Sequence, residues 1–298
     1  MTRVLESRDE VAGRLLQSSQ RHSYDPVVDV DWDTPLDATL PALPWHRVSL
    51  HGSALWEQLD EAQRVQLSWH ELASISSVGL WFELILMQGL LRYAYDQDPH
   101  TPHVQYALTE IGDETRHSVM FARAAELLAP GARYRPAART HQLGRLYKTL
   151  AAGPALFASV LVAEETLDRL QREMLRTDGL LPLAQRVARI HVTEEARHVS
   201  YARAAVTRQV PKLSRSQLEA ARVATAVTSA YVVDSFLDPR VYAAVGLDPV
   251  VAARVARRNP AHVETRLWMA EKVVGFLRDA GLVNGPATLV WRRAGLLA

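Results

Sequence analysis

The sequence predicts an all-α protein with a four-helix bundle at its centre. From about residue 60 the chain consists of long helical stretches that end at clusters of Pro, Gly or Asp. No segment shows the period-2 pattern of β-branched residues with turn signals that strands require. The chain has 298 residues, 48% of them hydrophobic, which is enough for a substantial core. We therefore expect one all-α domain over residues 1–298.

The helix breaks divide this domain into three parts. Residues 1–57 are expected to form an arm, in which the proline-rich segment 29–48 is extended or turning rather than helical. The bundle should occupy residues 58–210, and residues 211–298 should add further helices. Bundle helices are expected at 60–95, 101–128, 154–176 and 182–209, with a loop between the second and third, and the added helices near 214–236, 248–257 and 260–280.

Composition excludes several classes of function. A net charge of +1 and a pI of about 8.1 do not indicate a nucleic-acid partner. The absence of Cys excludes disulfides, thiolate metal sites and iron–sulfur clusters. The first residues contain no continuous apolar stretch like that of a signal peptide, so we expect a cytoplasmic protein.

The segment 72–91 is twenty residues long and contains one ionisable group, Glu83, at its middle. Its length would allow a membrane span. A carboxylate at mid-bilayer is costly, however, and the chain offers no second span. We therefore expect no membrane association, and predict a helix that is buried on all sides in a soluble protein. Such a buried acid needs a partner.

Two similar motifs, TEIGDETRHS and HVTEEARHVS, lie in the second and fourth expected helices. Each contains Glu-x-x-His, as Glu114 with His117 and as Glu195 with His198. Residues three or four apart share a helix face, so each pair points in one direction, and His191 joins the second pair. One such motif is common by chance, but two motifs in one helical core are typical of a metal site.

Ferritin-like di-iron bundles use two Glu-x-x-His helices and two helices that give one Glu each. The first expected helix supplies Glu83, and the third supplies Glu164 or Glu165. The interval from Glu83 to Glu114 equals the interval from Glu164 to Glu195, so one constant offset of 81 in the numbering relates the two halves. This spacing favours Glu164. Carboxylates and imidazoles suit Fe, Mn or Zn, and some of the acids should be protonated when no metal is bound.

Several polar neighbours of the motifs can take either of two roles. His191 lies one turn before Glu195, and the same offset relates it to Glu110; each is either a ligand or a hydrogen-bonded neighbour. Asp113 and Glu194 are candidates to accept hydrogen bonds from the motif histidines. Arg116 and Arg197 could pair with these two acids or lie exposed.

The set TEIGDETRH, VAEET and HVTEEARH, with WFEL upstream, resembles the AurF-like di-iron oxygenases, whose namesake is p-aminobenzoate N-oxygenase. The resemblance covers about residues 24–209 and is weak beyond residue 210. It implies a ferritin-like fold, a homodimer, and a metal site with one histidine more than the ferritin pattern, at the position of His191. The ligands that it implies are Glu83, Glu114, His117, Glu164, His191, Glu195 and His198.

The resemblance also implies a function. We expect two Fe ions, for which Mn could substitute, O₂ as co-substrate, an external electron donor, and a small organic substrate. The favoured reaction is oxidation of an amine to a hydroxylamine, nitroso or nitro product. The alternatives are a di-iron C–H hydroxylase or desaturase, and a non-catalytic ferritin-like iron-binding protein.

Overall fold

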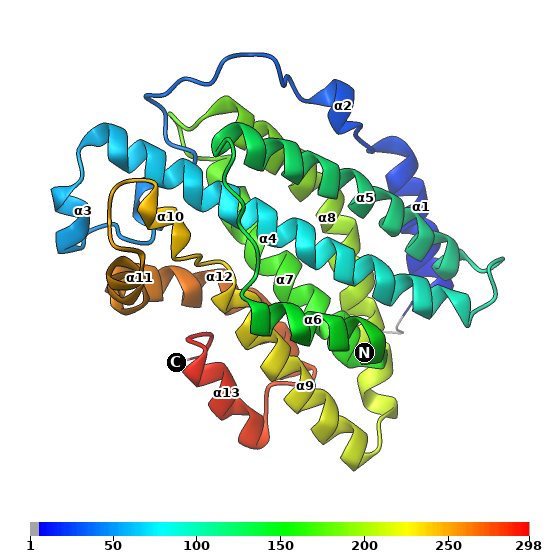
Figure 1. The fold of residues 1–298 in the computed structure, drawn as a ribbon. Coiled ribbons are helices and arrows are strands. Elements are labelled where there is room, and N and C mark those ends of the chain that lie inside the picture. Colours follow the sequence, from blue (N-terminus) through cyan, green and yellow to red (C-terminus); the bar gives the residue numbers. More distant parts are fainter. Residues whose placement is uncertain (1–5, 298) are drawn as a thin grey trace.

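The computed structural model describes residues 6–297, and it confirms the all-α prediction, with no strand in this range. Four long helices form the bundle (Figure 1): α4 (Glu61–Tyr95), α5 (Pro102–Leu128), α7 (Gly153–Met174) and α8 (Pro182–Gln209). Helix α4 pairs mainly with α5, and α7 mainly with α8, so the bundle consists of two helical hairpins.

The bundle helices begin and end where the sequence predicts, because the signals are local. Asp60 caps α4 through a reciprocal capping box with Gln63. Proline stands in the first turn of α5, α7 and α8, where its missing N–H costs no helical hydrogen bond. Each observed end lies within two residues of the expected one.

The expected arm contains a helix that the sequence interpretation missed. Helix α1 (Arg8–Arg21) is capped by Ser7, and its apolar side packs against α5 and α8 through Val11, Ala12 and Leu15. Beyond it lie three short elements: α2 (Pro26–Asp29), η1 (Trp45–Arg47) and α3 (Ala54–Gln58). Residues 30–44 contain no helix, as expected, but the prediction for 29–48 is wrong at its end, where η1 forms one turn of 3-10 helix.

The expected loop between the second and third bundle helices is partly wrong, because it contains α6 (Ala138–Leu150). Gly144 of α6 lies directly against the ring of Trp81 on α4. A Cβ at Gly144 would come within 2.5 Å of that ring, so only glycine permits this close approach. Helix α6 therefore covers one side of α4.

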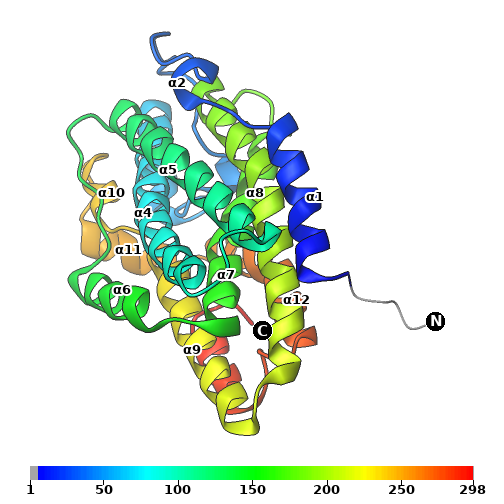
Figure 2. The ribbon, with the colours of Figure 1, turned by 90° about the vertical axis from the view of Figure 1, so that its right-hand side faces the viewer.

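The C-terminal part adds helices to the side of α7. The elements are η2 (Val210–Lys212), α9 (Arg215–Asp234), α10 (Arg240–Ala243), α11 (Pro249–Arg258), α12 (Pro260–Asp279), η3 (Gly285–Ala287) and α13 (Thr288–Arg293). Helices α9 and α12 both pack on α7, and Figure 2 shows α6 and α9 near the same end of that helix. The three expected helices are present, and the short α10 and α13 were not expected.

Helix α4 is long and apolar enough to cross a membrane by length and composition, but a core helix passes the same test. Half of its most apolar window is buried. The expectation that it is buried on all sides is wrong, because Leu84 and Leu91 are exposed on its outer face.

A buried polar network joins the arm and the added helices to the bundle. Glu71 of α4 accepts hydrogen bonds from the backbone N–H and the hydroxyl of Ser49. The Ser49 hydroxyl lies 2.8 Å from the hydroxyl of Tyr242 in α10. Asn259, which caps α12, donates to the carbonyl of Ser49 at 2.9 Å.

Two apolar clusters fill the bundle, one toward each end. On α4, for example, Ile75 belongs to the first cluster and Leu86 to the second, and Glu83 lies between them. On α5, α7 and α8 as well, acids or histidines lie between the residues of the two clusters. The bundle therefore encloses one layer of buried polar side chains.

Candidate metal centre

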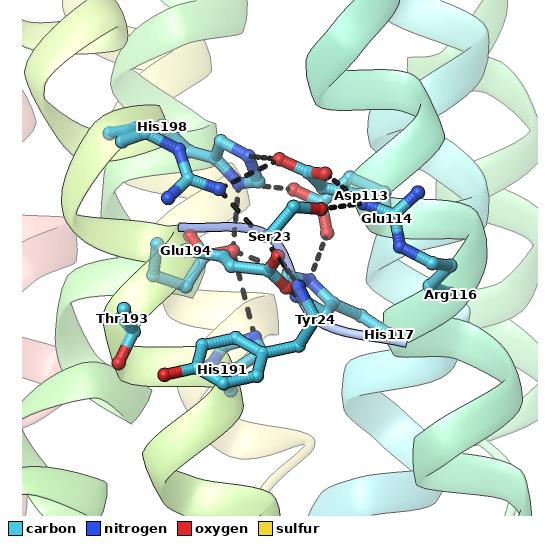
Figure 3. Close-up of polar contacts among 12 residues, drawn as sticks. Ser23, Tyr24, Asp113, Glu114, Arg116, His117, His191, Thr193, Glu194 and His198 are labelled. Carbon is cyan, nitrogen blue, oxygen red and sulfur yellow. Dashed lines mark hydrogen bonds and ion pairs between the residues drawn. The ribbon is translucent and has the colours of Figure 1, made fainter. Parts of the chain in front are cut away.

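The buried polar layer contains all seven residues that the sequence predicts as ligands. They are Glu83, Glu114, His117, Glu164, His191, Glu195 and His198, and each is at most 4% exposed. Together with Glu110, they form overlapping groups of three in which the ligand nitrogen and oxygen atoms all lie within 4.8 Å of one another. Part of this arrangement is visible in Figure 3.

The constant offset between the two halves of the sequence appears in space as an approximate two-fold relation. One group consists of His117, His191 and Glu195, and the offset converts it into His198, Glu110 and Glu114. Both groups are present. Glu110, which the sequence left as a ligand or a hydrogen-bonded neighbour, is 1% exposed and has an unpaired carboxylate oxygen.

Adjacent acids on α7 have different environments. Glu164 lies in one group with Glu83 and His191 and in another with Glu114 and Glu195. Glu165 points away from this layer and binds Arg203, whose Nε donates to its Oε1 at 2.6 Å. The structure therefore separates Glu164 from Glu165 in the same way as the equal intervals in the sequence do.

Each motif histidine is held by an acid on the opposite hairpin, as expected. His117 Nε2 donates to Glu194 Oε2 at 2.8 Å, and His198 Nε2 donates to Asp113 Oδ2 at 3.2 Å (Figure 3). Nδ1 of each ring faces a predicted ligand carboxylate: it lies 2.9 Å from Glu114 Oε2 for His117 and 2.9 Å from Glu195 Oε1 for His198. His198 Nδ1 also lies 2.8 Å from Glu114 Oε1.

Arginines and the arm surround these acids. Arg197 donates to Asp113 at 3.2 Å, and Arg116 also donates to Asp113. The backbone N–H of Tyr24, in the arm, donates to Glu194 Oε1 at 3.0 Å. Both arginines therefore take the paired role, and the arm closes over the outer side of the centre (Figure 3).

His191 has the opposite ring orientation. Its Nδ1 lies 2.7 Å from Oε1 of Gln171 on α7, an amide oxygen that can only accept, so Nδ1 carries the hydrogen. Its Nε2 has no hydrogen-bond partner. The sequence interpretation missed Gln171, because nothing in the residues around it marks a contact with a side chain on the next bundle helix.

The four predicted carboxylates divide into two pairs by pKa. Burial and neighbouring carboxylates raise the pKa of Glu83 and Glu164 well above the usual range. Burial also opposes ionisation of Glu114 and Glu195, but the adjacent His198 lowers the pKa of both. Without metal, the environment therefore favours the protonated form of Glu83 and Glu164 and the ionised form of Glu114 and Glu195.

The pKa values of the three histidines are shifted as well. Burial opposes the charged form of His117, but hydrogen bonds to Glu114 and Glu194 raise its pKa to about 9. Burial acts in the same way on His198, whose pKa is raised by Glu195 and Glu114. Burial lowers the pKa of His191 to about 4, so this ring is neutral. The neighbouring carboxylates therefore favour the charged form of His117 and His198.

The donor set fits a metal centre. Buried polar atoms normally have hydrogen-bond partners. Glu83 Oε2, His191 Nε2 and Glu195 Oε2 have none, although all three are buried in the same layer. Carboxylate oxygens and neutral imidazole nitrogens are the ligands that Fe, Mn and Zn take in proteins. These residues can hold two divalent ions once the protons on the acids and histidines are released.

The family model of p-aminobenzoate N-oxygenase AurF matches residues 6–281. The chain belongs to the AurF family. Among curated proteins, uncharacterised proteins of Mycobacterium tuberculosis (strain H37Rv) and of Mycobacterium bovis are 29% identical to it over 296 residues. These matches cover 95% of this chain and 86% of each relative. Membership of the AurF family indicates a di-iron oxygenase that acts on a small molecule, and it confirms the ferritin-like fold.

In this AurF-family protein a cavity of about 600 Å³ adjoins the centre. It lies between α4, α6, α7 and α9, and Glu164 forms part of its wall. Trp81 and Phe82 of α4, immediately before Glu83, also line the cavity. The volume is within the range of pockets that enclose small organic molecules. Sequence reasoning did not find it, because α6 was taken for a loop.

Proposed function

We propose that this protein is a di-iron oxygenase that uses O₂ to oxidise an arylamine at its nitrogen. The observation that carries the proposal is the cavity that ends at Glu164. A centre that only stored iron would have no need of an organic pocket against one of its carboxylates. Family membership supports the N-oxygenation.

The first oxidation balances with one external reductant. The amine R–NH₂, O₂, two electrons and two protons give R–NHOH and H₂O. Further rounds would give the nitroso and nitro products. The electrons come from a donor outside the chain, and the protein supplies the site in which O₂ and the amine meet.

We assign the metal ligands to Glu83, Glu114, His117, Glu164, His191, Glu195 and His198. Two iron ions bound to them would supply the activation of O₂, and manganese could occupy the same donor set. The four carboxylates balance the charge of two divalent ions in a buried layer.

The neighbouring side chains keep these ligands in place. Glu194 and Asp113 fix the rings of His117 and His198 with Nδ1 directed inward. Gln171 fixes His191 with Nε2 directed inward. The apolar clusters above and below the layer exclude water from the centre.

One observation favours a second reaction at the same site. The cavity is lined mostly by apolar side chains, and a hydrocarbon group seated beside Glu164 would be a substrate for C–H hydroxylation or desaturation. Oxidation at nitrogen and oxidation at carbon would use the same metals, O₂ and electron donor. They differ only in which substrate atom lies nearest to the metal centre.

We also propose that the protein is a homodimer in the cytoplasm. The outer face of α4 and α5 exposes Leu84, Leu91, Leu108 and Val119, four large apolar side chains. Thr115 of α5 contacts Met87 of α4 at 3.3 Å within the same face, so the apolar groups of the two helices adjoin. Light scattering of the protein and of Val119→Arg would test this interface.

The experiment that tests the function uses iron-loaded, reduced protein, a panel of arylamines and ¹⁸O₂. Mass spectrometry should find ¹⁸O on nitrogen, and none with Glu114→Ala. A ¹⁸O label on carbon would contradict N-oxygenation and support C–H hydroxylation instead. Oxidation of the iron with no change in any organic compound would contradict the oxygenase proposal.

A further inference from the structure

The cavity beside Glu164 contains no positive charge in its lining. Among the described residues that form its wall there is no Arg, Lys or His, and the only acid or base is Glu164 itself. The remaining lining residues are aliphatic, aromatic or uncharged polar. A negatively charged substrate group would therefore find no cationic side chain among the residues that line the wall.

Part of the polar lining is already used within the protein. The Ser159 hydroxyl donates to the carbonyl of Ala155 at 2.8 Å, and the Tyr147 hydroxyl donates to the same carbonyl at 3.3 Å. The side-chain oxygen of Gln217 accepts from the backbone N–H of Ser214 in the capping box at the start of α9. The hydroxyl groups that remain in the wall, such as that of Thr228 on α9, are neutral.

The mouth of the cavity is apolar as well. Leu146 and Leu150 of α6 and Val227 of α9 line the cavity and are exposed to solvent. The apolar surface thus continues from the outer rim to the side of Glu164. This arrangement favours a substrate whose body is hydrocarbon along its length, since burial of apolar surface drives binding.

p-Aminobenzoate, after which the family is named, carries a carboxylate opposite its amine. A buried carboxylate that is not paired with a cation is costly, and the lining of this cavity offers none. We propose that the substrate of this protein is instead a neutral, predominantly hydrocarbon molecule with no carboxylate, and that its body lies between α6 and α9. The identity of the oxidised atom rests on the proposed function, whereas the apolar class of the substrate rests on the cavity.

The test compares two probes of nearly equal shape, p-isopropylaniline and p-aminobenzoate. Calorimetry would measure both dissociation constants on the full-length, iron(II)-loaded protein without O₂, so that binding is measured without turnover. The neutral probe should bind at least about tenfold more tightly, because each tenfold corresponds to about 1.4 kcal/mol and an unpaired polar group costs about that or more.

Two variants place a cation in opposite walls of the cavity. Leu143→Arg on α6 and Val227→Arg on α9 should each reduce the preference for p-isopropylaniline by about tenfold or reverse it. Leu289→Arg on α13 is the matched control, because Leu289 is an exposed leucine that does not line the cavity, and it should leave the preference unchanged. Circular dichroism would establish that each variant is folded.

Equal or tighter binding of p-aminobenzoate to the unaltered protein would overturn the inference, as would failure of both probes to bind at millimolar concentration. Unchanged selectivity in both cavity variants would show that binding occurs elsewhere, which also overturns it. If p-isopropylaniline binds with the expected preference but is not oxidised when O₂ and a reductant are added, N-oxygenation fails and the apolar substrate class stands.

Discussion

Replacing Glu71 by Gln should make the metal-free protein more stable above pH 7 and leave it nearly unchanged at pH 5. Glu71 is buried in the network with Ser49 and Tyr242, and it precedes Glu83 on the same helix. Burial raises its pKa from 4.5 to about 7, although the hydrogen bonds from Ser49 oppose this rise. Glutamine resembles the protonated acid, since it has one carbonyl oxygen and one donor group.

The sign follows from proton linkage. Between pH 4.5 and 7 the folded protein keeps a proton on Glu71 that the unfolded chain has released, so the free energy of unfolding falls as the pH rises. The stabilisation that the protonated Glu71 gives to the folded protein is complete below pH 4.5 and is lost once the pH exceeds about 7. A pKa unit corresponds to about 1.36 kcal/mol, so the total loss is about 3 kcal/mol. Glu71→Gln should not show this loss.

Urea unfolding near pH 5 and near pH 8, followed by circular dichroism, would measure the difference between variant and unaltered protein at each pH. Glu61→Gln, an exposed acid in the first turn of the same helix, is the control for loss of one charge. A difference for Glu71→Gln that is the same at both pH values would refute the reasoning.

Since the network joins the arm, the bundle and the added helices, we also expect one cooperative transition.

Three further predictions concern the metal centre. Glu164→Ala should lose iron, whereas Glu165→Ala should keep its iron and lose only the ion pair with Arg203. Comparable iron loss in both variants would contradict the assignment of Glu164 from the equal intervals in the sequence. His191→Ala should keep most of its iron and lose or redirect amine oxidation, because a neutral ring adds no charge to metal binding; wild-type amine oxidation would contradict this role. Iron affinity should rise with pH between about 6 and 9, because the metal must displace the proton that a pKa of about 9 keeps on His117. A titration against a competing chelator would measure this affinity at each pH. An affinity that does not change with pH would contradict the prediction.

The bundle could be predicted from the sequence because its signals are local. Prolines and capping residues lie at the helix ends, and the long apolar stretches leave little ambiguity. Helix α1 could not be recognised, because few of its side chains are apolar and its face is defined by packing on α5 and α8. Helix α6 follows a proline and depends on the contact between Gly144 and Trp81, which only the tertiary structure brings together.

The candidate site divides in the same way. Regular spacing locates its ligands, since equal intervals separate equivalent positions in two similar hairpins. The same offset points to Glu110, but only the structure shows that its carboxylate faces the cluster. Gln171 belongs to no motif, and its contact with His191 arises from the packing of α7 on α8. The cavity depends on α6 and α9, which lie outside the four bundle helices.

The measurement that tests the account most directly is the metal content of iron-loaded protein. The seven-residue donor set predicts two iron ions per chain, and Glu114→Ala and Glu195→Ala should each lose most of the metal, because both residues occur in groups drawn from opposite hairpins. Circular dichroism would establish that the variants remain folded. Two fully occupied metal positions in either variant, or fewer than two in the unaltered protein, would contradict the di-iron assignment.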